Sequence, residues 1–395
     1  MKHLIGFVVI FFALFLDTEI ANQVGGYKLM YIAVIILILY LVINIVNRKI
    51  RYEKIALYIF FLAFCICIFK WAVGQNYLIR VLNFLVTPML ISICYENFTK
   101  KDLTLLLRFI IIFYTIECGL SIVEWTLNRN FFVFSEWILV VIYNLDKYEG
   151  VFRSTSLLGH PLANAQVVAV FMTFIAVSNF KRKYLQIFLF FLGYVSLFCF
   201  NARGAILVVT VFTVPYFIWK INKITHPSKK LIVKFAVFCI ICGLAYSITQ
   251  TPLGGRLMNI ELMDSSAQTR INVFEFTNYV NNDDLLWGNR GISVHLWENL
   301  GIVVENGILS LILDFGIIFT IPILFLLFLF QYRKLSLYSK IEKWLLLAVF
   351  YIIGCMNPNL VLAIQWTMWI NAFYAFQHLN TENISSINDN RNFNS

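Results

Sequence analysis

Long apolar runs separated by short polar segments dominate the chain. A helix needs about 20 mostly apolar residues to cross the hydrocarbon core of a bilayer. By that measure the pattern predicts twelve spans and therefore an all-α polytopic membrane protein. The predicted spans are Leu4–Leu16, Leu29–Val46, Ile55–Val73, Tyr77–Cys94, Leu103–Trp125, Pro161–Phe180, Tyr184–Phe200, Ala205–Trp219, Leu231–Ile248, Ile308–Phe330, Trp344–Met356 and Val361–Phe376.

The first run has some features of a signal peptide, because Lys2 and His3 precede a short apolar core. No small-x-small cleavage site follows this core. We therefore expect the first helix to be retained.

Lysine-rich connections alternate with lysine-poor ones along the chain. The lysine-rich connections are 47–54, 99–101, 181–183, 220–230 and 331–343. With twelve spans, all five fall on one side, which the positive-inside rule identifies as the cytoplasm. Both termini are then cytoplasmic, and the large polar loop 249–307 is extracytoplasmic.

These spans divide the chain into six parts. The expected parts are the first five helices (1–125), an outer loop with an interfacial apolar segment (126–160), helices six to nine (161–248), the large outer loop (249–307), the last three helices (308–376) and a disordered cytoplasmic tail (377–395).

Composition supports the membrane assignment. Hydrophobic residues make up 60% of the chain and charged residues 13%, whereas a soluble domain carries about a quarter charged residues. The net charge of +10 sits in short clusters between apolar runs. This distribution is typical of a membrane protein, so we expect no nucleic acid partner. All eight cysteines lie in or at the ends of apolar runs, and we interpret them as small hydrophobic residues without disulfides or a metal.

Arginine is the main cation of the predicted outer face. The large loop has three arginines (Arg256, Arg270 and Arg290) and no lysine. The planar guanidinium group suits phosphate or carboxylate oxygens, so these arginines favour an anionic ligand. The alternative is that they pair with the seven acidic residues of the same loop.

Two carboxylates are predicted inside the membrane. Glu117 and Glu124 are seven residues apart, and therefore on one face of their helix. Because an ionisable group in a bilayer usually faces a cavity or a partner, we expect a cavity that opens outward. Arg80 and Lys70 are the expected partners.

Several motifs follow one another in a recognisable order. They are VFRSTSLLGHPLANAQ (151–166), FNARGAILVV (200–209), DSSAQTRINVFEF (264–276), LLWGNRG (285–291) and VENGILSLILDFG (304–316). Over roughly residues 150–320 the chain resembles the O-antigen ligase and Wzy-type polysaccharide polymerase superfamily. Two departures stand out: Asn201-Ala202 replaces the usual serine before Arg203, and Glu305 replaces the histidine at the end of the large loop.

The resemblance implies a glycosyltransferase of the bacterial plasma membrane with its site on the extracytoplasmic side. It would polymerise undecaprenyl-diphosphate-linked glycan repeat units, without a metal or other cofactor, in company with membrane lipids, a flippase and a chain-length regulator. Arg153, Arg203 and Arg270 would contact the diphosphate, with Arg256 and Arg290 in reserve. Glu305 is the first candidate for the general base, followed by Asp264 and His160.

Two alternatives remain open from the sequence. One is a ligase that joins the polymer to its final acceptor, against which the loss of the histidine at position 305 weighs. The other is a lipid-linked oligosaccharide flippase or another multi-pass transporter. Transporters usually show related halves and short loops, and neither is apparent here.

Overall fold

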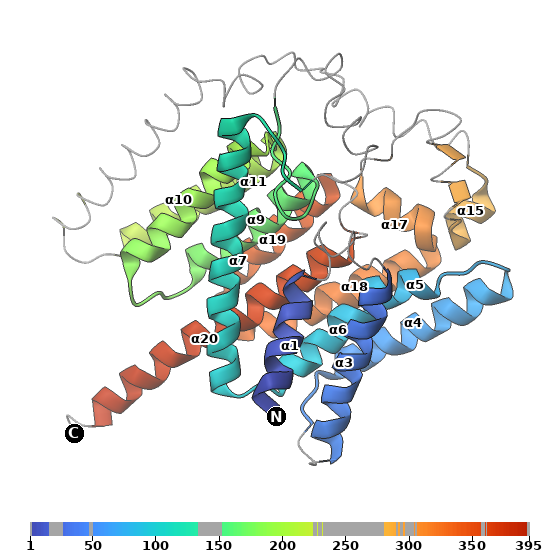
Figure 1. Ribbon diagram of the computed structural model, residues 1–395, viewed down its shortest axis with the longest axis horizontal. Coiled ribbons are helices and arrows are strands. Elements are labelled where there is room, and N and C mark those ends of the chain that lie inside the picture. The colour runs from blue at the N-terminus through green and yellow to red at the C-terminus, as the bar shows by residue number, and fades with distance from the viewer. Residues whose placement is uncertain are drawn as a thin grey trace.

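The structure is a bundle of helices (Figure 1). It is a computed structural model that describes residues 2–15, 27–46, 50–132, 152–223, 227, 231, 280–289, 291–292, 295–296, 304, 306–356, 360 and 362–392. Over these ranges every regular element is a helix and none is a strand. The all-helical prediction is therefore confirmed for the described residues.

Five helical segments within the described ranges are long and apolar enough to cross a membrane. They are α4 (Lys54–Ala72), the continuous segment of α5, η1 and α6 (Leu78–Val81, Leu82–Val86 and Thr87–Glu96), α7 (Lys100–Leu127), α11 (Arg203–Asn222), and α18 (Ile317–Lys334) with the short turn η4 (Leu335–Leu337). Shorter apolar segments lie in α1 (Lys2–Phe15), α3 (Tyr27–Val46), α9 (Pro161–Val177) and α10 (Lys183–Cys199). The remaining elements are α15 (Asn282–Trp287), α17 (Gly307–Phe315), α19 (Lys340–Met356) and α20 (Ala363–Asn392). The span predicted at Leu231–Ile248 lies almost wholly outside the described residues.

The predicted span Ile308–Phe330 is wrong as a single helix. It is broken at Gly316, which has φ +81° and ψ 160° and separates α17 from α18. Asn306 starts α17 because its side chain accepts hydrogen bonds from the amides of Ile308 and Leu309, at 3.0 and 3.1 Å. An apolar run of spanning length therefore contains two helices.

The end of the chain also differs from its prediction. The last helix, α20, continues to Asn392, where the sequence predicted a disordered tail from residue 377. Residues 363–392 contain neither glycine nor proline, so no residue in this stretch interrupts the helix.

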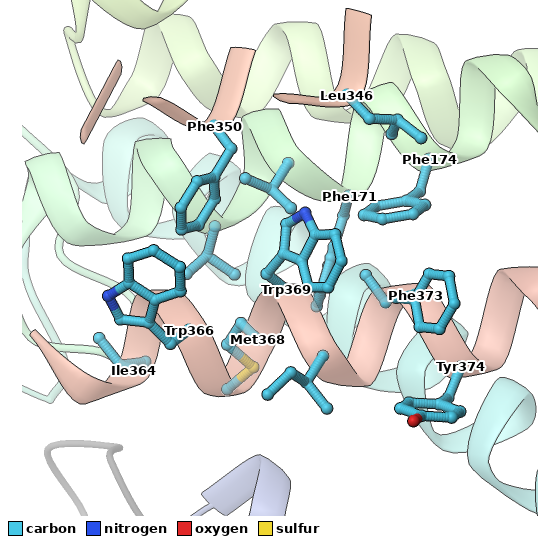
Figure 2. Packing of buried hydrophobic residues seen from close by; sticks show 14 of the residues in the cluster. Phe171, Phe174, Leu346, Phe350, Ile364, Trp366, Met368, Trp369, Phe373 and Tyr374 are labelled. Atoms are coloured by element: carbon cyan, nitrogen blue, oxygen red, sulfur yellow. The ribbon is translucent and has the colours of Figure 1, made fainter. Parts of the chain in front are cut away.

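The core of the bundle surrounds α9. Every residue of this helix except Leu162 is buried, because α7, α10, α11, α19 and α20 all pack against it. Figure 2 shows aromatic rings from α9, α19 and α20 interleaving along this contact. The rings of Phe350 and Trp366 lie 4.8 Å apart, centroid to centroid. A helix that is apolar all round is expected in such a central position.

Peripheral helices instead show apolar side chains on the outer surface of the bundle. On α4 the side chains of Phe61, Phe64 and Trp71 are 68%, 62% and 81% exposed. Large apolar surfaces of this kind are rare on soluble monomers and suit contact with lipid. Together with the long apolar helices, they indicate a membrane protein.

Candidate functional site

Residues 152–160 form an irregular segment that lies buried where α7 and α10 end. Ser154, Thr155 and Ser156 are each fully buried. Buried backbone amides need hydrogen-bond acceptors, and here α7 supplies them. The amides of Thr155 and Ser156 donate to one carboxylate oxygen of Glu124, at 2.8 and 2.9 Å. The other oxygen of Glu124 accepts from the amide of Phe131 at 2.9 Å.

Glu117 binds the same segment from a position on α7 seven residues before Glu124. Its Oε2 accepts a hydrogen bond from the amide of Leu157 at 3.2 Å, and its backbone carbonyl accepts one from the hydroxyl of Ser156 at 3.1 Å. Within the described part of the chain, its Oε1 has no hydrogen-bond partner. Glu117 and Glu124 thus hold the backbone that carries Arg153.

The expected pairing of these carboxylates with Arg80 and Lys70 is therefore wrong. Arg80 instead binds Asp314, and Lys70 binds backbone carbonyls. The irregular segment leaves buried amides that require acceptors, and the two glutamates satisfy them. The expected outward-opening cavity at Glu117 and Glu124 stays a prediction.

Arg153 connects this segment to the turn between α10 and α11. Its Nε donates to the carbonyl oxygen of Phe200 at 3.1 Å, while the amide of Ser154 donates to the carbonyl oxygen of Cys199 at 3.0 Å. Asn201 then adopts a left-handed conformation with φ +52°, and Arg203 is the first residue of α11. The structure thus places Arg153 beside the turn that carries Arg203, although 49 intervening residues separate them in the sequence.

His160 precedes Pro161, the first residue of α9. Burial and the nearby positive charge of Arg153 lower the pKa of His160 from 6.5 to about 4. The imidazole is therefore neutral at physiological pH. It can accept or donate a hydrogen bond, but it is a weak base.

The charges around Arg153 favour an anion. Arg153 and Arg203 belong to two segments that contact each other. Helix α9 begins just after the first segment and α11 begins at Arg203. The amino-terminal ends of helices carry partial positive charge and commonly bind phosphate groups. This arrangement is suited to a phosphate or diphosphate group.

A second charged cluster lies at the end of α4. The Nε and one terminal nitrogen of Arg80 donate to Oδ2 of Asp314, at 3.0 and 2.6 Å. The fully buried Lys70 lies nearby and donates to the carbonyl oxygens of Trp287 and Gly288. These contacts join α4 and α5 to α15 and α17.

Five of the predicted site residues lie outside the described residues. They are Arg256, Asp264, Arg270, Arg290 and Glu305. Their roles stay predictions. Among the residues that are described, no group of three or more His, Cys, Asp or Glu side chains is arranged to hold a metal ion.

The structure adds residues that the sequence did not single out for the site. In the sequence Asp314 is one residue of a motif, and Lys70 is an expected partner of Glu117 and Glu124. Their signal in the sequence is weak, since each is one charged residue in an apolar run. Charged residues at membrane depth do call for a partner, but the identity of that partner depends on contacts across 217 to 234 positions.

Comparison with known protein families finds no family model that matches this chain. Comparison with curated proteins likewise finds no matching relative.

Proposed function

We propose that this protein polymerises glycan repeat units carried on undecaprenyl diphosphate, at the outer leaflet of a bacterial plasma membrane. One observation carries the proposal: Arg153 binds the turn that holds Arg203, so two motif segments meet in one place. A site for a lipid diphosphate needs cations of this kind close together, next to an apolar bundle.

The proposed topology follows from the charge pattern. Lys100, Lys183 and Lys340 each begin a helix, whereas Arg153 and Arg203 lie at the ends where α10 finishes and α11 begins. The lysine-rich ends are proposed to face the cytoplasm. Twelve spans, two cytoplasmic termini and an extracytoplasmic site complete this proposal.

In the proposed reaction, a sugar hydroxyl of a new lipid-linked unit attacks the anomeric carbon of the growing glycan. The new carbon–oxygen bond forms as the bond to the lipid diphosphate breaks, and the diphosphate leaves with the electron pair. Arg153 and Arg203, with Arg270 and the reserve residues Arg256 and Arg290, would stabilise its negative charge.

The hydroxyl proton must pass to a base. Glu305 is the proposed acceptor, with Asp264 as the next choice. The low pKa of His160 favours a different role, in which the neutral ring hydrogen-bonds a sugar hydroxyl or a phosphate oxygen. A flippase and a chain-length regulator are the proposed protein partners.

A deletion strain tests the class of function. Loss of a polymerase leaves single repeat units on the final acceptor and lipid-linked single units in the membrane. Loss of a ligase leaves no glycan on that acceptor, and loss of a flippase confines lipid-linked units to the inner leaflet. Restoring the intact gene serves as the control, and a deletion strain with polymer of normal length would refute the proposal.

A further inference from the structure

Residues 282–289 of the large loop are fixed to the bundle through α15. Figure 1 shows this short helix beside α17. The ring of Trp287, its last residue, stacks on Phe69 of α4 with centroids 4.7 Å apart. The amide of Asn289 donates to the carbonyl oxygen of Leu313 at 2.8 Å. We refer to residues 282–289 as the docked limb.

Two glycines allow the docked limb to lie so close to the bundle. Gly288 and Gly316 have φ values of +76° and +81°, a conformation that disfavours other residues. A Cβ atom at either glycine would overlap the backbone around the other. The backbone of the limb therefore touches the break between α17 and α18 directly.

Lys70 holds this contact from the α4 side. Its ammonium group donates to the carbonyl oxygens of Trp287 and Gly288 at 2.7 and 2.6 Å, and to Oε1 of Gln75 at 3.2 Å. It also lies over the ring of Tyr77, 4.4 Å from the centroid. Cations near the carboxyl end of a helix stabilise its exposed carbonyls and dipole, so Lys70 stabilises the end of α15.

A simple membrane-anchoring role does not explain this geometry. A lysine that extends toward the membrane surface keeps its ammonium in water, whereas Lys70 is fully buried. All three of its oxygen acceptors belong to the protein. Asp314 and Asp284 supply negative charge nearby, and Arg80 fixes Asp314 in place. The cluster is therefore built to bind the limb.

The limb leads directly into a candidate part of the site. Asn289 is followed in the chain by Arg290, one of the reserve diphosphate contacts. If the limb docks only part of the time, the proposed diphosphate contact that follows it in the sequence can act only in that fraction of molecules.

We propose that Lys70 is a positioning residue, which docks residues 282–289 of the large loop and so sets the fraction of molecules competent to bind the lipid-linked substrate. This inference rests on the proposed function. An apparent dissociation constant rises in inverse proportion to the competent fraction. Loss of the ammonium is therefore expected to raise KM for the lipid-linked donor and leave kcat nearly unchanged.

The test compares Lys70→Met, Lys70→Arg and Lys54→Met in the full-length protein in lipid nanodiscs. Lys54 is exposed and lies at the opposite end of the same helix, so it provides a matched control. Amide hydrogen exchange of the docked limb reports docking without reference to activity. Polymerisation kinetics with a lipid-linked repeat unit then report its consequence.

For Lys70→Met we expect exchange in residues 282–289 and KM to rise by about tenfold each, with exchange in α9 unchanged. Lys70→Arg should restore most of both values, because guanidinium keeps the charge and the donors. Unchanged exchange in the limb would overturn the docking role. Faster exchange with an unchanged KM, or a fall in kcat alone, would overturn the positioning role. Failure of the proposed function is distinguished by the deletion strain, which would then make polymer of normal length.

Discussion

Arg153 donates a hydrogen bond from its Nε to the carbonyl oxygen of Phe200 at 3.1 Å. This bond ties an irregular buried segment to the turn before α11. The same segment accounts for the two buried glutamates of α7, because Glu117 and Glu124 accept hydrogen bonds from its backbone amides. The two carboxylates of α7 thus hold the segment that carries Arg153 in place by binding its backbone.

Glu124→Gln should destabilise the protein and misplace Arg153. The amide nitrogen of glutamine cannot accept a hydrogen bond, so at least one of the amides of Phe131, Thr155 and Ser156 would lose its acceptor. We expect a loss of about 3 kcal/mol in unfolding free energy, measured by thermal unfolding in detergent. Arg129→Ala, at an exposed position just beyond α7, should leave stability unchanged. Equal stability of Glu124→Gln and the unaltered protein would contradict this account of the segment.

The low pKa of His160 predicts acid sensitivity. Between pH 6.5 and about 4, the unfolded chain binds a proton at this residue that the folded protein excludes, so stability falls as the pH falls. The loss attributable to His160 approaches about 3 kcal/mol at the lower limit.

His160→Asn removes this titration. Thermal unfolding measured from pH 7 to pH 4 should therefore change less steeply in the variant. The same pH dependence in both proteins would show that the folded protein does not hold His160 as a neutral ring.

Gly316→Ala should disrupt the contact between the docked limb and the break in the helix. Gly316 has φ +81° and ψ 160°, a region essentially restricted to glycine, where another residue costs about 2 kcal/mol. Overlap with the backbone of Leu286 and Trp287 adds to this cost. We expect a lower unfolding temperature and faster exchange in residues 282–289.

Gly119→Ala is the matched control, because Gly119 lies within α7 and its Cβ would meet nothing within 4 Å. That change should leave stability equal or slightly higher, since alanine favours helix. If the two substitutions have the same effect on exchange, the contact with Gly288 is not what fixes the limb.

The helical architecture could be predicted from the sequence because the length and apolar composition of each run are local properties that need no knowledge of its partners. The start of α9 at Pro161 was predicted correctly for a local reason, since proline suits the first turn of a helix. The break at Gly316 could not be predicted because Gly316 packs against Gly288, 28 positions away in the sequence. A hydropathy pattern cannot predict such a contact.

The site was predictable only in part for the same reason. The motifs suggested one shared ligand for Arg153 and Arg203, and the structure places Arg153 beside the turn that carries Arg203. The partners of Glu117, Glu124, Lys70 and Arg80 were not predictable, because each is chosen by packing between segments far apart in the sequence. Local charge spacing suggested that these four residues neutralise one another. In the structure the two glutamates accept backbone amides, Lys70 binds backbone carbonyls and Arg80 binds Asp314.

We propose that Arg203, at the turn that Arg153 contacts, serves the transfer of a lipid-linked glycan. The most direct measurement is the length distribution of the surface polymer in a deletion strain that expresses Arg203→Ala, with Arg129→Ala as the exposed control. Membrane levels of both variants are measured in parallel. We predict that Arg203→Ala abolishes long polymer at a normal membrane level, while Arg129→Ala supports the normal distribution. A normal polymer length distribution with Arg203→Ala would contradict the assignment.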